Sequence, residues 1–158
     1  AEWGEFDLDA AQWRIPAAKM KMREEHVVPL ASQAVDILRE LQPLTGRGKY
    51  LFPSLRSPQE PMSENTVNVA LRRMGFDRET ATAHGFRAMA RTMAAERLGV
   101  APEVIEAQLA HEVADSLGRA YNRTQYLEQR ADLMKKWADY LDRLKAGAQV
   151  IALPPRAA

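Results

Sequence analysis

Apolar and polar residues alternate with two different periods along this chain, and the change of period separates a short extended region from a longer helical one. Residues 12–17 (QWRIPA) and 24–30 (EEHVVPL) are short runs rich in β-branched or aromatic residues, as strands usually are. The basic link AKMKMR separates the two runs. The pattern predicts a β-hairpin or meander whose tip lies at Lys19 to Arg23.

Later segments repeat apolar residues every three or four positions, as the buried face of a helix does. Ser32 is suited to cap the first of these helices, and Pro43 is expected to help stop it. Gly75 can end the second, Thr82 can cap the third, and Pro102 suits the first turn of the fourth. The five predicted helices cover residues 33–44, 64–75, 83–99, 102–112 and 123–145.

These elements predict an α+β fold that is mostly α, with a small antiparallel sheet or hairpin at the N-terminal side packed on a bundle of about five helices. The segment GRGKYLFPSLRSPQEP is dense in Gly, Pro and Ser and is expected to be a loop. Tyr50, Leu51 and Phe52 are expected to bring one short part of it into the core. We assign residues 1–146 to one domain and expect residues 147–158 to be a disordered tail.

Composition agrees with one folded domain in a reducing compartment. The chain has 158 residues, 46% of them apolar, which is enough for a single hydrophobic core. It contains no cysteine, which excludes disulfides and thiolate metal sites. No apolar run approaches the roughly 18 residues of a membrane span, and no signal-peptide pattern opens the sequence. We therefore expect a soluble, cytoplasmic protein that does not bind membranes.

Charge becomes informative only when its distribution is considered. The 22 basic and 21 acidic side chains leave a net charge of +1, so the total argues neither for nor against a polyanionic partner. The acidic residues gather at the start and in the last third. Basic residues form two runs with few acids, namely Arg14, Lys19, Lys21 and Arg23, and then Arg72, Arg73, Arg78, Arg87 and Arg91.

Five polar residues stand where a purely structural helix or hairpin would not need them. His84 and Arg87 are three residues apart and share one helix face. His111 ends another helix in LAHE, Tyr121 lies in GRAYNR before the last helix, and Lys21 lies at the hairpin tip. Each also has an ordinary structural explanation, such as a helix-terminal histidine that complements the helix dipole or a lysine that keeps a sheet edge soluble. Singly, none of them defines a site.

The order Lys, His-x-x-Arg, His, Tyr resembles the catalytic domain of tyrosine recombinases, the phage integrase family, and in particular the integrases of prophages and integrative elements. The resemblance covers almost the whole chain. KMKMREEHVVPL is similar to the hairpin with the catalytic lysine, and ATAHGFRAMARTMAAERLGV to the His-x-x-Arg helix. IEAQLAHEV resembles the segment with the second histidine, and RAYNRTQYLEQRADLMKKWADYLDRL the nucleophile and its following helix.

The resemblance implies a site-specific DNA recombinase or integrase that cuts and rejoins DNA strands through a 3′-phosphotyrosyl intermediate, without ATP, a metal or another cofactor. Lys21, His84, Arg87 and His111 would then surround the scissile phosphate, and Tyr121 would attack it.

Two of these roles have a competitor in the sequence. Lys21 is preferred to Lys19 because it precedes Pro29 by eight residues, the usual interval in the family, although Lys19 stays an alternative. Tyr126 is the competing nucleophile, and it ranks below Tyr121 because it is expected to lie inside the last helix.

The implied partner is double-stranded DNA, bound as a tetramer in the intact protein, with accessory DNA-bending proteins as possible further partners. In related enzymes the segment beyond the tyrosine docks on a neighbouring subunit, and here Trp137, Tyr140 and Leu144 would make that contact unless this helix only covers the core. Contacts to phosphates, which depend on salt rather than on sequence, are expected from the basic residues Lys19, Arg23, Arg72, Arg73 and Arg91.

One departure from the family matters. Its first catalytic arginine lies in a helix upstream of the strand that resembles EWGEFDLD, and the sequence begins with that strand. We therefore expect these 158 residues to be a fragment that is inactive alone. Two other functions stay open, a type IB topoisomerase, which uses similar chemistry, and a catalytically dead DNA-binding module that keeps the fold.

Overall fold

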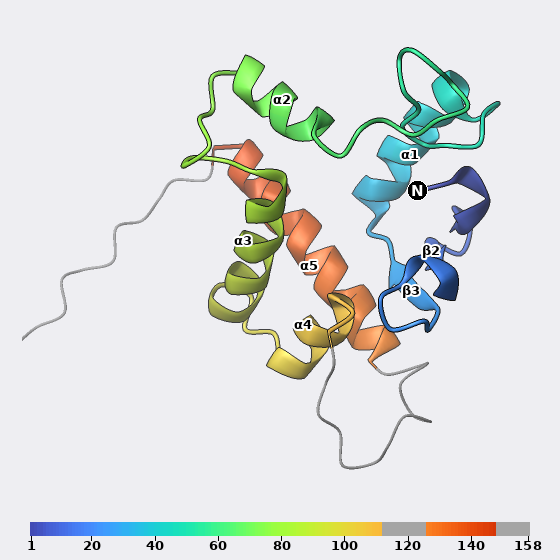
Figure 1. The fold of residues 1–158 in the computed structure, drawn as a ribbon. Coiled ribbons are helices and arrows are strands. Elements are labelled where there is room, and N and C mark those ends of the chain that lie inside the picture. Colours follow the sequence, from blue (N-terminus) through green and yellow to red (C-terminus); the bar gives the residue numbers. More distant parts are fainter. Residues whose placement is uncertain (112–125, 148–158) are drawn as a thin grey trace, which may run out of the picture.

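The computed structural model describes residues 1–111 and 126–147. Within these residues, five α-helices accompany one three-stranded antiparallel sheet, which confirms the predicted α+β fold. Figure 1 shows helices α3, α4 and α5 grouped beside the sheet, with α5 running through the middle of the group. The sheet therefore flanks the helices that carry the predicted site residues.

The sheet contains the predicted hairpin and a short strand within EWGEFDLD. Its order is β1 (Phe6–Asp7), β2 (Gln12–Ile15) and β3 (His26–Pro29). Trp13 pairs with Phe6 on one side and with Val28 on the other, and its ring stacks on Phe6 at a centroid distance of 5.3 Å. Strand β2 ends before Pro16, which cannot donate a ladder hydrogen bond. The link that follows contains the short 3-10 helix η2 (Ala17–Lys19).

Helix α1 spans Ser32–Thr45, and two of the expected end signals act differently there. The N-cap residue is Ala31, whose backbone is extended (φ −70°, ψ 155°), and Ser32 is the first helical residue, with its hydroxyl donating to the Gln33 side chain at 3.1 Å. Pro43 lies inside the last turn and does not end the helix. A proline so close to the C-terminal end removes only one backbone hydrogen bond, so the turn persists to Thr45.

The region between α1 and α3 is mainly loop, as expected. Leu51 is 2% exposed and enters the core, whereas Phe52 is 48% exposed, so only part of the Tyr50 to Phe52 segment is buried. Helix α2 covers Thr66–Arg73 and is shorter than predicted. Gly75 follows it with φ +93°, a left-handed conformation that favours glycine, as its predicted role at the helix end requires.

The main core lies between the last three helices. Helix α3 spans Ala83–Glu96, and the hydroxyl of its predicted cap Thr82 accepts from the backbone N–H of Gly85 at 2.9 Å. Helix α4 covers Pro102–Gln108 with Pro102 in the first turn, and α5 covers Leu127–Lys145. The buried residues that join the three helices are Ala94, Val104, Ile105 and Leu133.

Some sequence predictions fall partly outside the described residues. Tyr121 and residues 148–158 of the expected tail lie there, as do the first residues of the predicted helix 123–145. The predicted helix 102–112 ends at Gln108, because Ala110 takes a left-handed conformation with φ +54°. No helix among residues 1–111 and 126–147 is long and apolar enough to cross a membrane.

Candidate active site

A pocket of about 550 Å³ lies where the sheet meets helices α3, α4 and α5. Much of its wall is apolar and includes Ile15, Met134 and Trp137. Helix α3 contributes four residues at positions i, i+3, i+4 and i+7, so one helix face borders the pocket. The polar side chains that line it are His26, Arg87, Arg91, Gln108 and His111.

The structure brings two of the predicted site residues together. Arg87 Nη2 lies 3.0 Å from His111 Nε2 and also donates to the carbonyl oxygen of Leu109. Arg87 comes from α3, whereas His111 comes from the turn after α4. Both residues are exposed. Among the described residues these contacts use only Nη2.

Glu106 joins this pair to Arg91. One carboxylate oxygen accepts from Arg91 Nε at 2.7 Å, and the other accepts from His111 Nδ1. The hydrogen bond from His111 is the main cause that holds the pKa of Glu106 below its usual value, and Arg91 adds to it against the opposing effect of burial. Sequence reasoning expected Arg91 to contact DNA and did not single out Glu106.

His84 is placed differently from Arg87 and His111. It is exposed at the second position of α3, one helical turn before Arg87. His84 is not among the residues that line the pocket. The i, i+3 spacing therefore puts it next to the Arg87–His111 pair along the helix, at the outer edge of the site.

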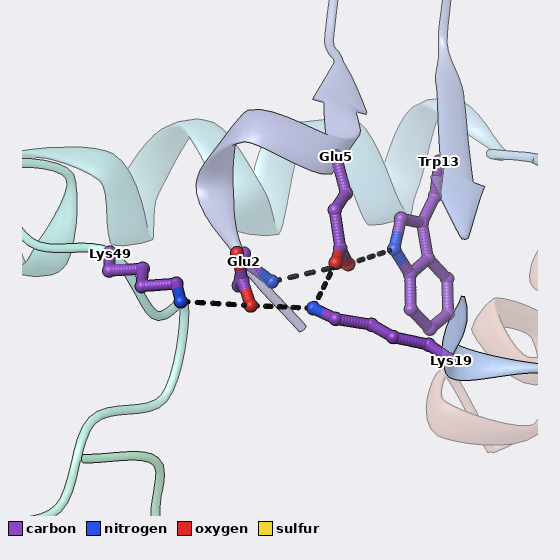
Figure 2. Close-up of polar contacts among 5 residues, drawn as sticks. All are labelled: Glu2, Glu5, Trp13, Lys19 and Lys49. Carbon is purple, nitrogen blue, oxygen red and sulfur yellow. Dashed lines mark hydrogen bonds and ion pairs between the residues drawn. The ribbon is translucent and has the colours of Figure 1, made fainter. Parts of the chain in front are cut away.

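The two lysines that compete for the catalytic role have different surroundings. Lys19 ends η2, and its ammonium donates to Glu2 at 2.6 Å and to the buried Glu5 (Figure 2). Hydrogen bonds to Glu2 and Glu5 are the main cause that raises the pKa of Lys19. Lys21 is exposed in the loop between η2 and β3, and Arg23 is exposed beside it.

Arg72 has a structural contact that its sequence position does not reveal. Its guanidinium donates to the carbonyl oxygens of Phe76 and Ala81, which ties the end of α2 to the segment before α3. Arg73 is exposed. DNA contacts by Arg72, Arg73, Lys19, Arg23 and Arg91 stay predictions.

Arg130 forms a separate polar cluster with two residues of the pocket wall, Gln108 and His26, and sequence reasoning missed it. This α5 residue is 6% exposed. It donates through Nε to Gln108 Oε1 at 2.8 Å and through Nη2 to the carbonyl oxygen of Val27 at 2.5 Å. The available signal was its position on the apolar face of the predicted helix, three residues from both Leu127 and Leu133.

His26 completes this second cluster. Its Nε2–H donates to the backbone carbonyl of Gln108 at 3.2 Å, and Arg130 Nη2 lies 3.4 Å from the same nitrogen. Burial, followed by the nearby charges of Arg130 and Arg87, lowers the pKa of His26. Burial also lowers the pKa of Arg130 to about 10, which leaves it charged at neutral pH.

The two aromatic residues considered for intersubunit contact, Trp137 and Tyr140, have contacts within the molecule. Trp137 lines the pocket, and the Tyr140 hydroxyl lies 3.5 Å from Met93 Sδ. Leu144 is exposed.

No metal site is formed by the described residues. Residues 1–111 and 126–147 contain no group of three or more His, Cys, Asp or Glu side chains that could hold an ion.

The mostly helical fold with a small antiparallel sheet is consistent with the catalytic domain of a tyrosine recombinase. Residues 1–128 match the sequence model of the phage integrase family. The chain belongs to this family, as its resemblance to the tyrosine recombinases predicts.

Individual relatives agree with this assignment. The chain is 44% identical to the prophage integrase IntA of Escherichia coli K12 over 151 residues, which cover 96% of this chain and 36% of that protein. It is 43% identical to the integrase of enterobacteria phage P4, with 90% of this chain and 36% of the relative covered. The chain thus spans about a third of the length of the curated relatives it matches. No solved structure matches it.

Proposed function

We propose that the protein carrying this chain is a site-specific DNA recombinase of the integrase type, which cuts and rejoins DNA strands through a 3′-phosphotyrosyl intermediate. The observation that carries the proposal is the meeting of Arg87 and His111, 3.0 Å apart, at a pocket between three helices and the sheet. Relatives that are 43% and 44% identical to the chain are named integrases. DNA integration is therefore the reaction we assign.

The chemistry of a phosphodiester explains why these residue types suit the site. Attack on phosphorus needs positive donors that stabilise the additional negative charge on the non-bridging oxygens. The planar guanidinium of Arg87 can donate to two phosphate oxygens at once, which a lysine cannot do as a point charge. His111 adds a second donor from another element, and His84 a third at the outer edge.

Lys21 is the residue to which we assign protonation of the leaving 5′ oxygen. Lys19 is engaged by two carboxylates, and releasing its ammonium would leave the buried Glu5 without that partner. Lys21 is exposed in the same loop. A general acid must reach the oxygen that leaves, and a side chain in an exposed loop can approach bound DNA from the outside.

Tyr121 is the proposed nucleophile. Its oxygen would lose the phenolic proton to solvent and bond to phosphorus as the 5′ oxygen leaves with a proton from Lys21, and the 5′ hydroxyl of a second strand would later reverse this step. The competing Tyr126 precedes α5 with a left-handed backbone, φ +59°, and packs against the core of α3, α4 and α5. Its ring would have to leave that core to reach a phosphate. This packing favours Tyr121.

The resemblance also supports the wider assembly. We propose that the intact protein binds double-stranded DNA as a tetramer, with accessory DNA-bending proteins at some sites. Arg14 does not stand in for the first catalytic arginine of the family. Arg14, on β2, is directed to Gln12 at 2.8 Å and to Glu25 at 3.9 Å. The 158 residues alone are therefore expected not to cleave DNA.

Covalent capture tests the nucleophile. Protein made from the whole natural reading frame is mixed with a library of nicked DNA duplexes, and protein–DNA adducts that survive denaturant are counted. The wild type should form adducts, whereas Tyr121→Phe should bind DNA but form none. Tyr126→Phe is the matched control and should keep adduct formation. Adducts that persist in Tyr121→Phe would overturn the assignment of the nucleophile.

The same preparation separates the alternatives. Arg87→Lys should slow adduct formation about 100-fold, because one fork of donors is replaced by a point charge. Efficient relaxation of a supercoiled plasmid that lacks any selected site would indicate a type IB topoisomerase. Sequence-specific DNA binding with neither adducts nor relaxation would indicate a catalytically dead module.

A further inference from the structure

The turn after α4 places Glu106 and His111 side by side. The backbone N–H of His111 donates to the carbonyl of Glu106 at 2.9 Å, and the N–H of Ala110 donates to that of Ala107 at 3.2 Å. These two hydrogen bonds, together with the left-handed backbone of Ala110 (φ +54°), form the Schellman motif, a common C-terminal cap of helices. Such an ending usually brings two apolar side chains together, and here it joins a carboxylate and an imidazole.

Glu106 is held from the opposite side by α3. Arg91 donates to Glu106 Oε1 through Nε at 2.7 Å, and its Nη2 lies 2.5 Å from the same oxygen in an ion pair. Glu106 Oε2 is thereby directed to His111 Nδ1. The Glu106 side chain is 21% exposed, and both of its partners are more exposed. The carboxylate therefore links α3 to the turn that carries His111.

The contacts at both ring nitrogens define how His111 is protonated. A carboxylate can only accept a hydrogen bond, so Nδ1 carries a proton. The guanidinium of Arg87 can only donate, so the His111 Nε2 that faces it at 3.0 Å is the unprotonated nitrogen. Glu106 and Arg87 thus fix the ring orientation and the tautomer together.

We propose that Glu106 is a positioning residue of the recombination reaction, which holds His111 by Nδ1 so that Nε2 is directed at the phosphate bound by Arg87. The inference rests on the proposed function. A phosphate oxygen that takes the place of the Arg87 contact would face Nε2 while Glu106 still holds the ring by Nδ1. Glu106 therefore contributes the orientation of the ring.

Histidine NMR tests the orientation without any DNA. The chain contains three histidines, so a two-bond proton–nitrogen spectrum of protein labelled with ¹⁵N-histidine at pH 8 can be assigned with single His→Asn variants. Wild-type His111 should show a protonated Nδ1 and an unprotonated Nε2. In Glu106→Ala only Arg87 still restrains the ring, so the tautomer protonated at Nε2, which a free histidine side chain prefers, should gain population relative to the wild type.

Glu103→Ala is the matched control, because Glu103 lies in the first turn of the same helix and is exposed. Its His111 signals should match those of the wild type. A wild-type His111 protonated at Nε2 alone would overturn the proposal even if Glu106→Ala did not fold. An unchanged tautomer in a folded Glu106→Ala protein would overturn it as well.

Cleavage kinetics then test the role in the reaction. With protein from the whole reading frame, Glu106→Gln should lower the single-turnover rate of adduct formation about 10- to 100-fold, the range seen when a metal-bound histidine loses the partner that orients it. Its dissociation constant for DNA should stay within about twofold of the wild type. Glu103→Gln removes the same charge from the same helix and should leave both quantities unchanged.

The outcomes separate this inference from the proposed function. A wild type that forms adducts, together with a Glu106→Gln variant that cleaves at the same rate, would overturn the positioning role and leave the recombinase assignment intact. Absence of adducts in the wild type would overturn the recombinase assignment itself. A role in helix stability alone would lower the melting temperature of Glu106→Gln without changing its rate on saturating DNA.

Discussion

The polar cluster around Glu5 and the polar cluster around Arg130 bury charge in opposite ways. In the first, the buried Glu5 accepts from Trp13 and from the Lys19 ammonium, which also contacts Glu2 (Figure 2). In the second, Arg130 donates only to neutral groups, and no carboxylate among residues 1–111 and 126–147 pairs with it. The comparison shows that a carboxylate can be buried beside an opposite charge, whereas a guanidinium can be buried with neutral acceptors.

The clusters also differ in what they connect. The Glu5 cluster is local, since the partners of Glu5 lie within 14 residues of it. Arg130 joins α5 to Val27 on β3 and to Gln108 at the end of α4, across sequence separations of 103 and 22 residues. Loss of the Glu5 cluster should therefore release only η2, in the link between β2 and β3, from the N-terminal segment. Loss of the second should separate three elements at once.

The largest expected change in stability follows from replacing Arg130. Arg130→Ala leaves the Gln108 Oε1 and Val27 carbonyl acceptors without a donor and opens a cavity in a buried region, so the free energy of unfolding should fall by about 2–4 kcal/mol. Urea denaturation of the 158-residue chain at pH 7.5 measures it. Arg143→Ala removes an exposed arginine from the same helix and should cost less than about 0.5 kcal/mol.

Arg130→Met sharpens the comparison, because methionine fills most of the volume without the charge. If the hydrogen bonds to Gln108 and Val27 matter more than packing, Arg130→Met should stay well below the wild type in stability. A variant as stable as the wild type would show that the buried guanidinium contributes nothing net, as replacement of buried ionic groups by apolar side chains sometimes does.

Substitution in the Glu5 cluster should lower the free energy of unfolding less than substitution of Arg130. Glu5→Gln keeps the shape of the side chain but removes the charge that faces Lys19, and the free energy of unfolding should fall by about 1–2 kcal/mol at pH 7.5. Glu40→Gln on the exposed face of α1 is the matched control and should change it little. A loss for Glu5→Gln larger than that for Arg130→Ala would reverse the ranking of the two clusters.

The difference between the clusters also explains what the sequence could and could not predict. The hairpin and the start of α3 depend on local signals, the strand-like runs and the Thr82 cap, and both predictions were confirmed. The end of α4 was missed because Ala110 adopts a left-handed conformation that usually identifies glycine.

Tertiary contacts account for the remaining misses. Arg130 and His26 acquire their importance only when α5 meets β3, and no sequence spacing encodes a contact 104 residues apart. The same holds for Glu106, whose partner Arg91 lies on another helix. The family resemblance pointed to Arg87 and His111, but not to the residues that hold them.

The smallest expected effect is a pH dependence that belongs to the Arg130 cluster. Burial and the charges of Arg130 and Arg87 lower the pKa of His26 from 6.5. Below pH 6.5 the unfolded chain therefore binds a proton at this position that the folded chain does not, and the free energy of unfolding falls as the pH falls. Hydrogen bonds from Lys19 and Trp13 outweigh the burial that would raise the pKa of Glu5, so its pKa is lowered from 4.5 and its cluster weakens only in more acidic solution.

Urea denaturation at pH 7.5, 6.5 and 5.5 separates these two windows. The stability advantage of the wild type over His26→Gln should shrink between pH 7.5 and 5.5, because glutamine cannot bind the proton that the unfolded wild type gains. The advantage over Glu5→Gln should stay nearly constant across the same range, since Glu5 remains ionised there. His84→Gln replaces an exposed histidine and should change the free energy of unfolding little at pH 7.5. A His26→Gln variant whose stability runs parallel to that of the wild type between pH 7.5 and 5.5 would show that His26 titrates equally in the folded and unfolded chains. The Arg130 cluster would then not keep a second positive charge off His26.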